Sequence, residues 1–178
     1  EKNPEILVDG YKIEKYVTDL NIPIAIDFID SDMFILQKND GIIHLIQNGK
    51  LKEQPILDLE VSNYGEQGLL GITTVGDKIY LFFTEAFHDG GLSHGNKIYE
   101  YTWDGEKISN PKLIKSLLGW THGYNSGVMT HDLENKIFAV SGSQYRFGAL
   151  QNTPSDESLR CFTDEFCDDE TEITFFDS

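Results

Sequence analysis

A weak internal repeat runs through the sequence and constrains the fold more than any other feature. Three short apolar runs each follow a polar turn, and they occupy residues 33–36, 79–82 and 137–140. The first two copies also end on a hairpin signal, Asn48-Gly49 in one and Asp104-Gly105 in the other. The period of about 45 to 60 residues is the length of a four-stranded blade in a β-propeller. Because one blade cannot bury both of its faces alone, we expect neighbouring blades to stack.

The predicted strands divide the chain into a short tether, residues 1–10, and about three blades. The blades cover residues 11–64, 65–120 and 121–178, and no segment shows the periodicity of a helix. The first blade is expected to begin with a strand over residues 11–20, where apolar and polar residues alternate. Further strands are predicted at 24–29, 33–37, 42–47, 51–59, 69–75, 78–84, 97–103, 112–117, 127–130, 136–141 and 171–176.

The fold class that follows is all-β, a β-propeller of four-stranded antiparallel blades. Propellers close with about four to eight blades, so three blades leave raw edges. We therefore expect the chain either to be half of a longer domain or to pair with a partner chain that closes the ring. In a complete ring, residues 11–18 would form an outer strand on the last blade.

The charge of the chain excludes several classes of partner. Lysine and arginine number 14 against 30 acidic residues, which gives a net charge of −16. A chain so acidic is not expected to bind nucleic acid or to adsorb to an anionic membrane. Nor is there an apolar run of membrane-spanning length. The acidic excess suits solubility, and calcium binding by some of the carboxylates is the alternative.

The two cysteines, Cys161 and Cys167, lie close together in a polar, acidic segment. Two thiols in such a segment predict a local disulfide and an extracytoplasmic location, whether secreted, periplasmic or at the cell surface. Zinc is disfavoured because no second ligand pair has a matching spacing. His88, Asp89 and His94 share one loop, but their spacing fits no standard metal site, and none is predicted there.

Residues 65–71, Gly-Glu-Gln-Gly-Leu-Leu-Gly, carry a resemblance to a known family. This segment resembles the motif that opens the second blade in the glucose/sorbosone dehydrogenase family. Members of that family are soluble quinoproteins that use pyrroloquinoline quinone (PQQ) to oxidise aldose sugars. Residues 20–25, 39–43, 96–105 and 110–113 are similar to other stretches of the family, in the same order. The resemblance covers the N-terminal half of the family's domain.

The resemblance implies a six-bladed propeller in which PQQ lies over the central axis, held partly by calcium. It places Glu66, Gln67 and Asn125 at the sugar. The family's glycine-aspartate pair reads Gly142-Ser143-Gln144 here, so its carboxylate is missing, and Gln144 is the residue expected at the cofactor. The main quinone and calcium ligands of the family belong to later blades, which this chain does not contain.

The sequence departs from the family at the expected catalytic base. The family's histidine opens the third blade, and the matching residues 124–127 place Tyr124 at that position. Tyrosine has a pKa far above neutral and is a poor general base unless strongly perturbed. His122 lies two residues earlier and could take the role if the loop rearranges, so either His122 or Tyr124 is expected to face the axis beside Glu66. Two hypotheses follow: a PQQ-dependent sugar dehydrogenase, and a non-catalytic extracellular propeller that binds or scaffolds.

Overall fold

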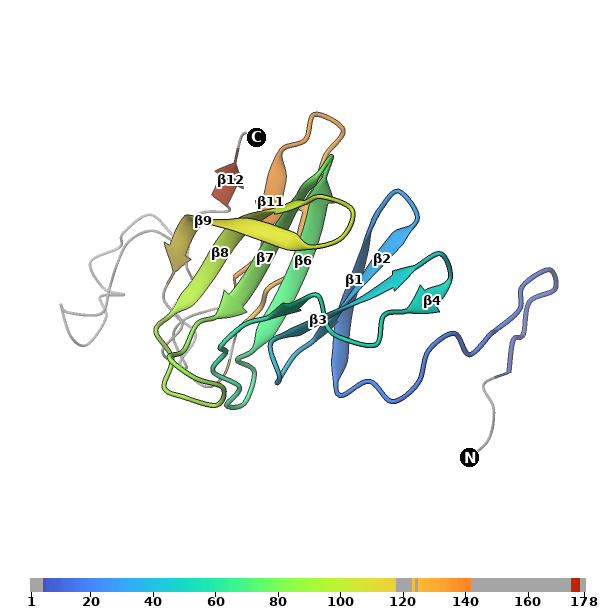
Figure 1. The fold of residues 1–178 in the computed structure, drawn as a ribbon, viewed down its shortest axis with the longest axis horizontal. Helices are drawn as coiled ribbons and strands as arrows, with labels where there is room; N and C mark the ends of the chain where they lie inside the picture. The colour runs from blue at the N-terminus through green and yellow to red at the C-terminus, as the bar shows by residue number, and fades with distance from the viewer. Residues whose placement is uncertain (1–4, 118–122, 124, 142–173, 177–178) are drawn as a thin grey trace, which may run out of the picture.

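The computed structural model describes residues 5–117, 123, 125–141 and 174–176, which form three antiparallel sheets of consecutive strands (Figure 1). The first sheet contains β1 (Pro23–Ile29), β2 (Asp32–Gln37), β3 (Ile42–Gln47), β4 (Lys50–Leu51) and β5 (Leu57–Asp58). The second contains β6 (Leu69–Val75), β7 (Lys78–Thr84), β8 (Asn96–Trp103) and β9 (Ile108–Leu117). The third contains β10 (Met129–His131), β11 (Ile137–Ala139) and β12 (Thr174–Phe176).

This arrangement confirms the prediction of an all-β chain of antiparallel sheets, and the second sheet has the predicted four strands. The three sheets do not close into a ring, so the six-bladed propeller remains a prediction. Within the described ranges there is no helix, and hence none long and apolar enough to cross a membrane.

The hairpin turns form where the local sequence requires them. Asn48 and Gly49 both have positive φ, 53° and 72°, as a two-residue type I′ turn demands, and they pair Gln47 with Lys50. In the β8–β9 turn the carboxylate of Asp104 accepts hydrogen bonds from the backbone N–H groups of Glu106 and Lys107, both at 2.9 Å. These bonds lower the pKa of the Asp104 carboxyl group.

The outer strand of the first sheet is divided into two pieces. A single strand was expected over residues 51–59, whereas β4 and β5 both pair with β3 and residues 52–56 separate them. Lys52 and Ile56 still donate backbone hydrogen bonds to β3, at 2.8 and 2.9 Å. Pro55 has no N–H to donate, which explains the interruption between them.

The strand predicted over residues 11–20 is wrong. These residues form no strand, and the first sheet begins at Pro23. The side chains of Tyr11 and Tyr16 are 76% and 62% exposed. Alternation of apolar and polar residues favours a strand, but a strand forms only where a neighbouring edge accepts its backbone hydrogen bonds. In the described part of the chain this segment has no such neighbour.

Stacking of the sheets produces two apolar clusters. The first joins sheets one and two around Phe34 and Trp103, whose rings meet edge to face with centroids 5.2 Å apart. The second joins sheets two and three and contains Phe82, Ile98 and Ile137. Strands β1 and β10 both contact β6, so the first strands of the three sheets lie side by side. The stacking predicted from the repeat is therefore observed.

Sheets two and three come into backbone contact at a pair of glycines. A Cβ on Gly71 would overlap the carbonyl oxygen of Gly127, and a Cβ on Gly127 would overlap the side chain of Leu70. The last glycine of the 65–71 motif thus has a packing role, because only a residue without a side chain lets the two chains approach so closely.

Candidate functional site

The first strands of the three sheets, β1, β6 and β10, begin at the same end of the molecule. The residues singled out by the 65–71 motif lie at this end. The segment that leads from the first sheet into β6 carries Glu66 and Gln67, and the segment that leads into β10 carries Asn125. The ends of β2 and β7 reach the same place. Backbone bonds join these elements there, from Leu69 N to Lys38 O and from Thr84 N to Gly68 O, both 2.8 Å.

Glu66 and Asn125 meet at this end. Oε2 of Glu66 accepts a hydrogen bond from the backbone N–H of Asn125 at 3.0 Å. Glu66 is exposed and Asn125 is half-buried. The pair that the resemblance placed at the sugar is therefore in contact, although the two residues are 59 positions apart in the sequence.

A line of polar side chains continues inward from Asn125. Its Oδ1 accepts a bond of 3.0 Å from Nδ2 of Asn96, whose own Oδ1 accepts a bond of 2.7 Å from Oγ1 of Thr84. Thr84 and Asn96 are fully buried. Since buried polar groups must be paired, this chain of bonds fixes the side chain of Asn125 from below. Sequence reasoning missed Thr84 and Asn96, because nothing local to either residue signals its partner.

Gln67, which the resemblance also placed at the sugar, does not lie on the surface with Glu66. It is 1% exposed, and its Oε1 accepts a hydrogen bond of 2.7 Å from Oγ of Ser62. Its side chain points into the protein, unlike the exposed carboxylate of Glu66, and the sugar contact of Gln67 stays a prediction. The bond from Ser62 stabilises the turn that carries Glu66. A backbone bond from Gln67 N to Tyr64 O, 3.2 Å long, closes the same turn.

Lys38, at the end of the first hairpin, also supports this turn. Its Nζ donates to the carbonyl oxygen of Gly65 at 2.9 Å. Burial lowers the pKa of the Lys38 ammonium group, and the carboxylate of Glu66 opposes the change. Lys38 thus places a positive charge near Glu66, a role that its sequence context does not signal.

Several predicted residues lie outside the described part of the chain. They are both candidate bases, the cofactor contact and the two cysteines: His122, Tyr124, Gln144, Cys161 and Cys167. Their roles, and the disulfide, remain predictions.

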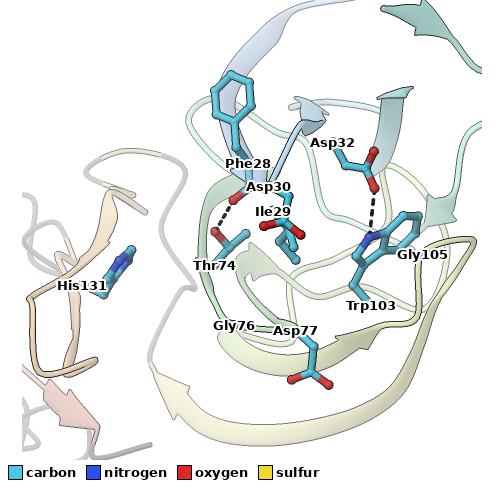
Figure 2. A pocket seen from close by; sticks show the side chains of 10 residues that line it. All are labelled: Phe28, Ile29, Asp30, Asp32, Thr74, Gly76, Asp77, Trp103, Gly105 and His131. Carbon is cyan, nitrogen blue, oxygen red and sulfur yellow. Dashed lines mark hydrogen bonds between the residues drawn. The ribbon is translucent and has the colours of Figure 1, made fainter. Parts of the chain in front are cut away.

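The opposite end of the sheets holds a cavity of about 620 Å³ (Figure 2). Residues of all three sheets line it, among them Asp30, Asp77 and His131. A third carboxylate, Asp32, accepts bonds from Trp103 Nε1 at 3.2 Å and from Gln47 Nε2 at 3.1 Å, and so it is committed to the structure. Neither Glu66 nor Asn125 lines this cavity, which makes the Glu66 end the better candidate.

Metal-binding geometry is absent from the described ranges. No group of three or more His, Cys, Asp or Glu side chains there could hold an ion. In the loop with two histidines, Asp89 instead accepts a hydrogen bond from the N–H of Val61 at 3.1 Å.

Solved structures resemble the chain, whereas no family model matches it and no curated protein is significantly similar to it. A Thermus thermophilus oxidoreductase described as a glucose dehydrogenase matches at 26% identity and a TM-score of 0.65, over 77% of this chain and 42% of that one. The PQQ-bound aldose sugar dehydrogenase of Streptomyces coelicolor matches at 20% identity and a TM-score of 0.66, over 79% and 43% of the two chains. A further glucose dehydrogenase matches at 21% identity and a TM-score of 0.59, over 69% of this chain and 41% of its own.

The chain therefore spans about two-fifths of the length of the proteins it matches. At 20–21% identity the similarity shows the fold alone. In the match at 26% identity, the sequences are similar as well as the folds. The chain is thus structurally similar to part of the glucose and aldose sugar dehydrogenases.

Proposed function

We propose that the chain contributes the sugar-facing part of a dehydrogenase that oxidises the anomeric hydroxyl group of an aldose. The observation that carries the proposal is the contact between Glu66 and Asn125, because it joins two segments that the resemblance assigns independently to the substrate. The structural similarity to glucose and aldose sugar dehydrogenases supports it.

The described residues do not provide a site for PQQ or for calcium, the two cofactors that the resemblance implies. Among them no group of three or more His, Cys, Asp or Glu side chains could hold calcium, and Lys38, which lies near Glu66, is half-buried and bonded to Gly65. These residues do not fit PQQ or calcium. As part of the proposal, both cofactors bind residues outside the described ranges, and one of the matched enzymes is PQQ-bound.

The role proposed for this chain is to bind and orient the sugar. The exposed carboxylate of Glu66 accepts hydrogen bonds, and sugar hydroxyl groups donate them. The bond from Asn125 N–H and the charge of Lys38 restrict the carboxylate before substrate arrives, which lowers the entropy lost on binding. We propose His122 or Tyr124 as the base, since both flank Gly123 next to Asn125.

The test is a dye-linked assay of the natural full-length protein with PQQ and calcium over a panel of aldoses. Glu66→Ala should raise KM more than it lowers kcat, because the carboxylate is proposed to bind substrate. His122→Ala and Tyr124→Phe then identify the base, since the variant of the true base should lose several orders of magnitude in kcat. Absence of quinone-dependent activity with every aldose would eliminate the proposal.

The second candidate is a propeller that binds carbohydrate without turnover. The observation that favours it is Tyr124, which replaces the histidine that the resemblance leads one to expect. Calorimetric titration of an aldose into the same protein separates the two candidates: binding that requires Glu66, with no oxidation in the presence of quinone, supports the second.

A further inference from the structure

The loop between β7 and β8, residues 85–95, lies beside the turn that carries Glu66 (Figure 1). Its Gly90 N donates a backbone hydrogen bond to Val61 O at 2.9 Å, and a Cβ added to Gly90 would lie 3.4 Å from Oδ1 of Asn63. Both partners belong to the segment that leads directly into the Glu66 turn. We call residues 85–95 the β7–β8 loop.

Hydrogen bonds hold the β7–β8 loop at its ends and in its middle. At the ends, Glu85 N donates to Gly95 O at 3.0 Å, and His94 N donates to Glu85 O at 2.8 Å. In the middle, Oδ1 of Asp89 accepts a bond of 3.1 Å from Val61 N. The loop is therefore fixed against the rest of the second sheet, and the side chains that it exposes occupy defined places.

Two large apolar side chains of this loop are exposed to solvent. Phe87 is 82% exposed and Leu92 is 89% exposed, while Tyr64, in the Glu66 turn, is 64% exposed. The rings of Phe87 and His94 meet edge to face with centroids 3.8 Å apart, so Phe87 is supported while most of its surface stays free. Apolar side chains displayed on a fixed loop beside a candidate site mark a contact for a ligand.

The surroundings of Phe87 indicate what kind of ligand fits. Hydrogen-bonding groups lie around it: His88 is exposed, and half-buried Asn63 donates to Asn39 O at 2.9 Å and directs its Oδ1 at the loop. A sugar ring matches this combination, because its C–H faces pack on an aromatic ring while its hydroxyl groups form hydrogen bonds. A stable protein partner would need roughly 800 Å² on each side, of which Phe87 and Leu92 supply only a fraction.

We propose that the β7–β8 loop forms a second saccharide subsite, in which Phe87 packs against the sugar unit that follows the aldose at Glu66. The favoured substrate is then the reducing end of a disaccharide or longer chain, and free monosaccharides are poorer substrates. The inference rests on the proposed function, because Glu66 must bind the first unit for Phe87 to meet the second. Phe87 determines specificity and is not catalytic, since the anomeric hydroxyl group that is oxidised belongs to the first unit.

The test compares glucose with the disaccharides maltose and cellobiose in the dye-linked assay of the natural full-length protein with PQQ and calcium. The wild type should oxidise at least one disaccharide with a higher kcat/KM than glucose. Phe87→Ala should lower kcat/KM for that disaccharide by about twofold to tenfold, the range expected for one lost ring contact, and leave glucose unchanged. Phe87→Tyr keeps the ring and should retain the preference.

Leu133→Ala is the matched control. Leu133 is fully exposed in the turn between β10 and β11, at the other end of the sheets. Both alanine variants remove an exposed apolar side chain, so both should keep the melting temperature of the wild type. Leu133→Ala should change kcat/KM for neither glucose nor the disaccharides.

Three results would overturn the proposal while leaving the proposed function intact. They are a wild type that prefers no disaccharide over glucose, an equal fall for both kinds of sugar in Phe87→Ala, and the same fall in Leu133→Ala. The proposed function fails separately, if no aldose is oxidised. Calorimetric titration of the same sugars then decides the subsite: tighter binding of a disaccharide that Phe87→Ala weakens supports it, and equal affinities or no binding overturn it.

Discussion

The carboxylate of Glu66 and the backbone N–H of Asn125 are joined by a hydrogen bond of 3.0 Å. The bond links the turn that opens the second sheet to the segment that opens the third. Because Asn125 is itself held by Asn96, the surface carboxylate is connected through side chains to the buried Thr84. The candidate site is therefore anchored to the core of the second sheet.

We expect Glu66→Ala to destabilise the described fold slightly, by about 0.5–1.5 kcal/mol, the usual contribution of one hydrogen bond. Urea unfolding followed by circular dichroism measures the change. Glu106→Ala serves as the control, since Glu106 is an exposed residue of the β8–β9 turn. A change in Glu66→Ala no larger than in Glu106→Ala would mean that the bond to Asn125 does not contribute to stability.

Gly71→Ala should be far more damaging, because the new methyl group would meet the carbonyl oxygen of Gly127. Overpacking of this kind costs about 1–3 kcal/mol or more when backbone has to move. The control is Gly76→Asn, at a turn where φ is +58° and a Cβ meets nothing within 4 Å. Asparagine tolerates that conformation, so the melting temperature of the control should stay close to that of the wild type. Equal melting temperatures for the two variants would contradict the close contact.

Stability should fall in mild acid because of His44. Burial lowers the pKa of this histidine below its ordinary value of 6.5, so folding favours the neutral ring. As the pH falls below 6.5 the unfolded chain binds a proton first, and stability is lost until the folded state titrates as well. Thermal melting at pH 7.5 and pH 5 should show a smaller difference in His44→Leu than in the wild type. Identical pH dependence in both proteins would exclude His44 as the cause.

Tyr80 should limit stability at alkaline pH. Burial, together with a 3.0 Å hydrogen bond to Glu100 and the charges of Glu100 and Asp77, raises the pKa of its hydroxyl group to about 12. A raised pKa in the folded state stabilises the protein below the ordinary value of 10, and this stabilisation is lost as the pH rises towards 12. Titration of tyrosinate absorbance should show one fewer late-ionising group in Tyr80→Phe than in the wild type. An unchanged titration curve would refute the assignment.

The parts of the fold that follow from local sequence could be predicted. The turn at Asn48-Gly49 specifies its own backbone angles, and apolar runs bounded by such turns located most of the strands. The segment 11–20 could not be judged in this way, since its pattern was right but pairing depends on a neighbour that sequence does not show. The same limit applied to β9, which begins at Ile108 although it was predicted to begin at 112. Asn110, with a φ of 56°, lies where the pairing of β9 with β8 shifts register, and such an irregularity interrupts the strand pattern in the sequence.

The candidate site was predictable only in part, for the same reason. The 65–71 motif indicated Glu66, and the resemblance indicated Asn125, but their contact spans two sheets. Gln67 adjoins Glu66 in sequence yet points inward, where its Oε1 accepts a hydrogen bond from Ser62 Oγ. Lys38 reaches Gly65 from another hairpin, and no pattern around it indicates that partner.

The prolines of the two outer strands have a consequence for the fate of the chain in concentrated solution. Pro55 interrupts the outer edge of the first sheet, and Pro111 lies within the outer strand of the second. Neither can donate to an incoming strand, and exposed lysines such as Lys52 and Lys112 lie nearby. The outer edges thus resist the strand-by-strand growth that leads β-rich chains to fibrils. Replacing either proline by valine would restore a continuous edge, and fibril formation would be expected to begin there.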